Sequence, residues 1–148
     1  MIEIDDYLPR HLTLELRDAL ASARVVNLVG PRQVGKTTLV RDLFDKGRFL
    51  TLDDAAFLAA MDADPEGQLM SLAEDQNTTP IIIDEAQRSR KLALAIKKIV
   101  DSDRRKGQFV LTGSSKFSPL PRSRTHWQAE CGHSSFGRCP WPRLTARL

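Results

Sequence analysis

The sequence predicts an α/β domain in which a mainly parallel sheet is flanked by helices. Short apolar runs typical of buried strands alternate along the chain with segments whose apolar residues recur at helical spacing. Strands that alternate with helices imply right-handed crossover connections, which place the strands parallel to one another. The chain has 148 residues, which is enough for a single domain with its own core.

The individual elements follow from these patterns. Four strands are predicted, at residues 24–30, 48–54, 80–85 and 108–113. Helices are predicted between them and before the first of them, at residues 11–23, 33–44, 54–63, 65–75 and 90–100. Pro65 suits the first turn of the fourth helix. After Pro119 the periodicity stops, so the sheet is predicted to be incomplete at its C-terminal end.

The basic charge of the chain is concentrated near its C-terminus. Residues 122–148 hold five Arg and one Glu, which leaves 17 of the 22 basic and 18 of the 19 acidic residues in the first 121 positions. Both Cys, both Trp and two of the three His also lie in this last segment. We therefore expect a core at residues 1–120 and a separate tail at residues 121–148.

Two classes of protein are not favoured by the sequence. No apolar run approaches the roughly 20 residues of a membrane helix, and the acidic N-terminal MIEIDDYLPR lacks the apolar region of a signal peptide. We expect a cytoplasmic protein that does not engage a membrane. The sequence does not indicate an oligomeric state.

A phosphate-binding loop is predicted at residues 30–37, where GPRQVGKT fits the pattern G-x-x-x-x-G-K-[ST]. Gly30 and Gly35 allow the backbone to turn its N–H groups inward, and the following helix adds its positive N-terminal end. Lys36 can reach the β- and γ-phosphates, and the Thr37 hydroxyl suits one Mg²⁺ position. The pattern is loose by itself, but here it lies between a buried strand and an amphipathic helix. The predicted nucleotide contacts are Gly30, Pro31, Arg32, Gln33, Val34, Gly35, Lys36, Thr37 and Thr38.

Two acidic residues end the third predicted strand. Asp84 and Glu85 follow three consecutive Ile, and ligands of open α/β sheets collect at the C-terminal ends of the strands. Asp84 is predicted to hold Mg²⁺, and Glu85 to accept a proton from the attacking water. A solvent-facing acidic strand end is the alternative, which the upstream phosphate loop makes the weaker one.

Polar residues also end the second and fourth predicted strands. Thr112 or Ser114 could hydrogen-bond the γ-phosphate or the attacking water, and ordinary turn chemistry is an equal alternative. Asp53 and Asp54 lie at the same edge, where Asp54 is predicted first as a helix N-cap. Arg32 faces either phosphate or solvent. The absence of an N-K-x-D element favours ATP over GTP.

The motifs YLPRHL, VVNLVGPRQVGKTTLV, FLTLDD, IIIDEAQ and FVLTGSS, in this order, resemble the bacterial and archaeal AAA-type P-loop ATPases that carry a C-terminal domain of unknown function. The resemblance covers about residues 7–117. It implies strand order 5-1-4-3-2, ATP and Mg²⁺ at the C-terminal edge, Walker A at residues 30–38, Walker B at Asp84 and Glu85, and a sensor in TGS. The chain departs from the family pattern at about residue 118. The departure leaves the fifth strand, and any arginine that completes hydrolysis, unassigned.

The tail is predicted to be an out-of-frame translation, as one deleted base would produce. The shifted frame reads the last base of each codon together with the first two bases of the next codon. In this frame, the codons for His126 to Cys131 can encode the residues L-A-G-R-M. Phe136 to Arg143 permits W-P-L-S-x-A-E. Family members carry both strings after LTGSS in this order. Structural zinc sites usually pair their ligands at short spacings such as C-x₂₋₄-C, and the tail has no such Cys pair, so a zinc site there is disfavoured. Its candidates are His126, Cys131, His133 and Cys139.

The sequence therefore predicts an ATP-binding hydrolase in which Lys36 neutralises phosphate charge, while Mg²⁺ is held by Thr37 and Asp84. Two alternatives stay open. One is a nucleotide-binding switch, or a truncated fragment, that binds ATP without turnover. The other is a nucleic-acid-associated ATPase that uses RSRK (88–91) and DRRKG (103–107). A solvated surface is preferred for these two stretches because residues 1–121 carry a net charge of −1.

Overall fold

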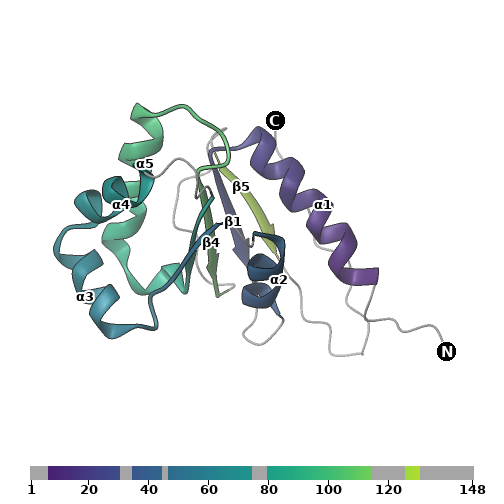
Figure 1. The fold of residues 1–148 in the computed structure, drawn as a ribbon, viewed down its shortest axis with the longest axis horizontal. Coiled ribbons are helices and arrows are strands. Elements are labelled where there is room, and N and C mark those ends of the chain that lie inside the picture. The colour runs from purple at the N-terminus through teal and green to yellow at the C-terminus, as the bar shows by residue number, and fades with distance from the viewer. Residues whose placement is uncertain (1–6, 31–34, 45–46, 75–79, 115–125, 131–148) are drawn as a thin grey trace.

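The computed structural model describes residues 7–30, 35–44, 47–74, 80–114 and 126–130, with side chains from residue 13 to residue 114 within those ranges. It confirms the predicted α/β class: strands and helices alternate along the chain (Figure 1). The elements are α1 (Tyr7–Ser22), β1 (Val25–Val29), α2 (Lys36–Leu43), β2 (Arg48–Thr51), α3 (Ala55–Ala63), α4 (Pro65–Ala73), β3 (Ile81–Asp84), the 3₁₀ turn η3 (Ala86–Arg88), α5 (Arg90–Ser102), β4 (Phe109–Gly113) and β5 (His126–Glu130).

The five strands form one sheet in the order β2-β3-β4-β1-β5. Each neighbouring pair is parallel. This is the order that the family resemblance implies. Because the strands are parallel, the residues that follow β1, β3 and β4 all emerge at one edge of the sheet. That edge is where the phosphate loop and the acidic residues were predicted to meet.

Helices cover both faces of the sheet, with α1 and α2 on one face and α3, α4 and α5 on the other (Figure 1). Successive strand residues point to opposite faces. Val26 and Leu28 of β1 pack with Leu16 of α1 and Val40 of α2. Val25 belongs to the other cluster, with residues of β3, β4 and the second helical layer. Both faces of the inner strands are buried, which explains their continuous apolar runs.

Polar side chains begin the helices of the second layer. The carboxylate of Asp54 accepts hydrogen bonds from the backbone N–H groups of Ala56 at 2.8 Å and Phe57 at 3.3 Å. The predicted N-cap is therefore confirmed. Ser89, which the sequence analysis did not single out, caps α5 in the same way by accepting from the N–H of Leu92 at 3.3 Å. These bonds satisfy donors that the first helical turn leaves unpaired.

The fifth strand lies inside the segment that the sequence analysis separated as a tail. It pairs with β1 from Val25 opposite His126 to Val29 opposite Glu130, so β1 has a partner on both sides. The strand was missed because it has no apolar run. Its sequence HWQAE does alternate polar and apolar residues, which is the period of a half-buried strand. The boundary at residue 120 and the out-of-frame origin of the tail stay predictions.

Gly107, in the turn between α5 and β4, is predicted to be intolerant of a side chain. Its φ is +68°, and an added Cβ would lie 3.1 Å from the carbonyl oxygen of Leu20. Its N–H donates to the carbonyl of Ala23 at 2.8 Å, so the turn is fastened to the end of α1. We expect Gly107→Ala to lower the free energy of unfolding by about 1–2 kcal/mol in urea denaturation. Lys106→Ala, at the exposed neighbouring position, is the control; equal losses in the two variants would contradict the prediction.

Candidate functional site

The segment predicted to be a phosphate loop connects β1 to α2. Gly30 is buried at the end of β1, and its N–H donates to the carbonyl of Gly113 at 3.2 Å, which joins the ends of β1 and β4. Gly35 caps α2 in the left-handed region with φ 80° and ψ 12°. Among the described residues, no atom lies within 4 Å of where its Cβ would be. Glycine is needed here for its backbone conformation, which other residues rarely adopt. The predicted contacts Pro31, Arg32, Gln33 and Val34 lie outside the described residues.

Lys36 is the first residue of α2, and its side chain folds back across the base of the loop. Its Nζ donates to the carbonyl oxygen of Gly30 at 2.9 Å, which joins the two ends of the eight-residue motif. The side chain is half-buried, whereas Thr38 two positions later is exposed. A cation held between the two ends of a Gly-rich motif is suited to meet phosphate oxygens.

The Asp84 carboxylate is the meeting point of the site. It lies at the end of β3 and is only 9% exposed. The Thr37 hydroxyl of α2 donates to its Oδ2 at 3.0 Å, and the Thr112 hydroxyl of β4 donates to its Oδ1. A buried carboxylate needs such donors because burial removes its hydration. The phosphate loop and the predicted acid, 47 residues apart in the chain, are thus in direct contact.

The two polar candidates at the end of the fourth strand are placed differently from one another. Thr112 is fully buried, and its hydroxyl is engaged with Asp84, so in this structure it supports the carboxylate instead of facing outward to a γ-phosphate. Ser114 directly follows β4 and is half-buried. No hydrogen bond from its side chain to another described residue is found. The roles of both residues toward nucleotide stay predictions.

Glu85 has an unusual backbone conformation. With φ 56° and ψ 38° it is the one non-glycine residue of the described chain at positive φ. The left-handed region costs an ordinary residue about 1–2 kcal/mol, and strain of this kind is concentrated at functional sites. This left-handed residue turns the chain away from the direction of β3, which ends at Asp84. The side chains of the two adjacent acids therefore lie in different surroundings.

Gln87 is a site residue that the sequence analysis did not single out. Its Nε2 donates to Oε2 of Glu85 across the single turn η3. Its other amide atom, Oε1, is buried and has no hydrogen-bond partner among the described residues. The amide orientation follows from the chemistry, since an ionised carboxylate can only accept. The available signal was the position of Gln87, two residues after the acid in IIIDEAQ.

Arg88 fastens η3 to the end of β2. Its Nη1 donates to the carbonyl oxygen of Leu52 at 3.0 Å and to Asp53 at 2.6 Å. Asp53 was predicted at this edge of the sheet and is indeed there, paired with the arginine. Both charged side chains are largely exposed, so their ion pair contributes at most about 1 kcal/mol. The hydrogen bond to the Leu52 carbonyl is therefore the contact that holds η3 against the end of β2.

The donor set fits a hard divalent cation such as Mg²⁺, which prefers hydroxyl, carboxylate and water oxygens. Thr37 can donate its proton to Asp84 while its oxygen lone pairs stay available to a cation. Among the residues the structure describes, no group of three or more His, Cys, Asp or Glu could hold a metal by itself. The tail residues considered for zinc lie outside the described side chains.

Comparison with known proteins agrees with this geometry. A model of the AAA domain family matches residues 22–132, so the chain belongs to this family of P-loop domains. The match includes β5, beyond the residues on which the sequence resemblance was based. The membership supports an ATPase-like, nucleotide-binding domain. None of the described helices is long and apolar enough to cross a membrane.

The relatives place the domain within longer proteins. The uncharacterized proteins Rv2008c of Mycobacterium tuberculosis and Mb2031c of Mycobacterium bovis are each 38% identical to the chain over 111 residues. That alignment spans 72% of this chain and 23% of each relative. Among solved structures, PCH-2 of C. elegans matches with a TM-score of 0.49 at 19% identity, over 83% of this chain and 40% of that one.

The Thr112 hydroxyl is predicted to stabilise the fold through Asp84. Thr112→Val keeps the side-chain shape but leaves a buried carboxylate oxygen without its donor. We expect the free energy of unfolding to fall by about 1–3 kcal/mol. Urea denaturation followed by circular dichroism measures the change. Thr112→Ser, which keeps the hydroxyl, should retain most of the stability; equal losses from Val and Ser would show that the methyl group and not the hydrogen bond matters.

Proposed function

We propose that this domain binds MgATP at the C-terminal edge of the sheet and hydrolyses its terminal phosphoanhydride bond. The observation that carries the proposal is the contact between Thr37, at the start of α2, and Asp84, at the end of β3. A phosphate loop and a carboxylate in register at one sheet edge are the minimum needed to hold a nucleotide and its cation together. Membership of the AAA domain family supports the same assignment.

Phosphate binding is proposed for the loop and the start of α2. Gly35 presents the first backbone N–H groups of the helix toward the loop, where the helix dipole favours negative charge. The Lys36 ammonium lies 2.9 Å from the Gly30 carbonyl oxygen, and we expect it to move onto the β- and γ-phosphate oxygens when nucleotide binds. A phosphate oxygen is a stronger partner for an ammonium than a neutral carbonyl is, because the bond is charge-assisted at both ends.

The cation is proposed to be held by the Thr37 hydroxyl and, directly or through water, by Asp84. When bound, Mg²⁺ would neutralise charge on the β- and γ-phosphate oxygens. Thr112 keeps the Asp84 carboxylate in one orientation by donating to its other oxygen. The protein thus presents the carboxylate in a pre-set position, which lowers the entropy lost on binding.

Hydrolysis is proposed to proceed by in-line attack of water on the γ-phosphorus. The new bond joins the water oxygen to phosphorus as the bond to the β–γ bridging oxygen breaks, and the products are ADP and inorganic phosphate. Glu85 accepts the water proton. Gln87 acts through Glu85: its amide nitrogen holds the carboxylate, and its buried Oε1 offers a second acceptor beside it. We regard Gln87 as a positioning residue.

Two substitutions separate binding from turnover. Lys36→Ala removes the loop cation and should weaken ATP binding at least about 10-fold. Glu85→Gln keeps the shape of the side chain but removes the proton acceptor, so ATP should still bind while phosphate release falls about 100-fold or more. Fluorescent-nucleotide titration and steady-state phosphate release measure the two effects. Tight binding by the unaltered chain without turnover would identify a nucleotide-binding switch and exclude the hydrolase.

Gln87→Ala tests the positioning role. We expect kcat to fall on the order of 10- to 100-fold with little change in KM, because the carboxylate loses its orientation while the phosphate contacts persist. Gln68→Ala, at a half-buried glutamine of α4, is the matched control and should leave both constants unchanged. A parallel change in KM, or unaltered kcat, would contradict the role.

A further inference from the structure

The segment from Arg88 to Gly107 has more basic than acidic residues, so its net charge is positive. It holds eight Lys and Arg against two Asp, whereas the rest of the first 121 residues holds nine basic and 16 acidic residues. Every one of the eight cations is exposed. They are Arg88, Arg90, Lys91, Lys97, Lys98, Arg104, Arg105 and Lys106.

Four of these cations surround one exposed apolar residue on α5. Leu94 is 72% exposed, and the cations lie three and four positions before and after it, at the spacing that brings helical side chains together. They are Arg90, Lys91, Lys97 and Lys98. The opposite face of the helix packs into the core through Leu92, Ala95, Ile96 and Val100. The charged face is therefore held outward by the burial of the apolar one.

The cations differ in how far their charge is already compensated. Lys98 pairs with Glu66 at 2.6 Å, and Arg105 pairs with Asp103 at 2.6 Å. The side-chain hydrogen bond from Arg105 also lowers the pKa of Asp103 below its ordinary value. Among the described residues, no ion pair or hydrogen bond is found for four of the eight side chains: Arg90, Lys97, Arg104 and Lys106. These four are distributed along the whole segment.

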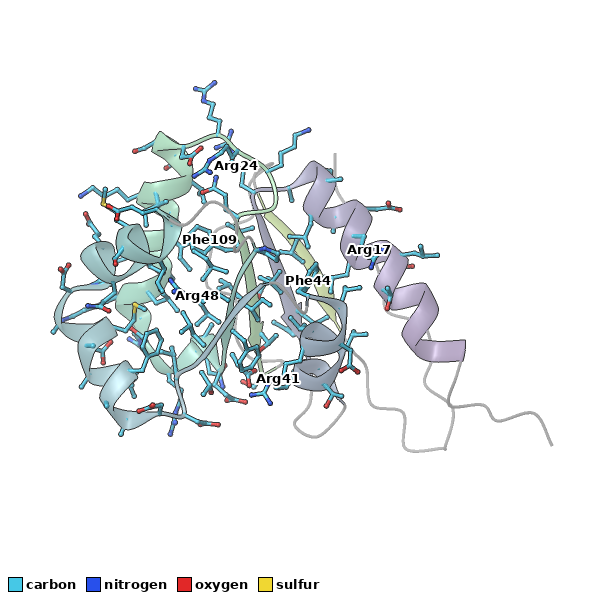
Figure 2. All side chains as sticks on the ribbon, in the orientation of Figure 1. Arg17, Arg24, Arg41, Phe44, Arg48 and Phe109 are labelled. Atoms are coloured by element: carbon cyan, nitrogen blue, oxygen red, sulfur yellow. The ribbon has the colours of Figure 1, made fainter. Side chains whose placement is uncertain are left out.

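The uncompensated charge extends along α5 and the turn that follows it. The 13 residues of α5 span about 20 Å, and the turn that follows adds Arg104 and Lys106. Nitrogen-tipped side chains project outward around this turn, near the labelled Arg24 (Figure 2). Because α5 connects β3 to the parallel strand β4, the row runs from the edge of the sheet that bears Asp84 back to the opposite edge.

We propose that this surface, residues 88–107, binds the phosphate backbone of duplex nucleic acid without reading its sequence. The spaced, uncompensated cations match a linear polyanion, and backbone contacts of this kind supply sequence-independent binding. The segment has no aromatic residue on which single-stranded bases could stack. Leu94 is its one exposed large apolar side chain, which is too little for the apolar core of a protein interface.

The net charge of −1 over residues 1–121 disfavours nucleic-acid binding when it is taken as a whole. That net charge is, however, the sum of a positively charged region, residues 88–107, and a negatively charged remainder. A polyanion meets a local surface and is attracted by the potential there, not by the net charge of the chain. The inference does not depend on ATP hydrolysis.

The test is fluorescence anisotropy of a short labelled DNA duplex with the full 148-residue chain, over a series of salt concentrations. Arg90→Glu/Lys97→Glu should weaken binding at least about 10-fold and reduce the slope of log affinity against log salt by about two. Arg143→Glu/Arg147→Glu is the matched control, since each pair lowers the formal net charge from +3 to −1. It should stay close to the unaltered chain. Arg90→Lys/Lys97→Arg preserves both charges and should retain binding.

Several results would overturn the proposal. These are unchanged binding by Arg90→Glu/Lys97→Glu, an equal loss in the tail control, or no duplex binding by the unaltered chain at low salt. Binding of poly-glutamate or of anionic phospholipid vesicles in preference to the duplex would assign the surface to a different partner. Thermal melting by circular dichroism verifies that each variant is folded. Should the α5 pair not fold, Arg104→Gln/Lys106→Gln in the following turn tests the same surface.

Discussion

The buried Asp84 carboxylate is the interaction on which the site depends. Its two oxygens receive hydroxyl donors from two different elements, Thr37 of α2 and Thr112 of β4. A carboxylate at the end of a buried strand is costly without such partners, so the three elements are stabilised in one relative placement. The same arrangement that stabilises the charge also fixes where a cation and a phosphate chain can be held.

This placement follows from the topology of the sheet. With β1 and β3 on either side of β4, the loop after β1, the acids at the end of β3 and the polar end of β4 converge at one edge. The bond from the Gly30 N–H to the Gly113 carbonyl ties two of these ends together directly. The pairing of β5 with the other side of β1 leaves the loop-bearing strand internal to the sheet, where its register is restrained from both sides.

The backbone strain at Glu85 and the positive charge of residues 88–107 lie in neighbouring parts of the chain, for which we propose different functions. Glu85 is held at positive φ by the surrounding turn, with Gln87 bonded to its carboxylate and Arg88 bonded to the end of β2. Immediately after this turn, α5 begins and presents its basic face to solvent. The proposed catalytic edge and the proposed nucleic-acid surface are therefore adjoining parts of one continuous stretch of chain, residues 84–107.

The sequence by itself determined the alternation of elements, the phosphate loop, the two acids after β3 and the Asp54 cap, because each depends on local periodicity or on a short motif. Only the tertiary structure decided the partners of Asp84, the Glu85–Gln87 bond and which residues form the strand beside β1. It also showed the cations of α5 as one exposed face. The contacts of Asp84 and the strand beside β1 join residues that are distant in the chain, and the cationic face depends on which side of α5 is buried. The Glu85–Gln87 bond is local, but it depends on the left-handed backbone at Glu85. Packing of the elements against one another sets the long-range contacts and the exposed face of α5, and local sequence does not encode them.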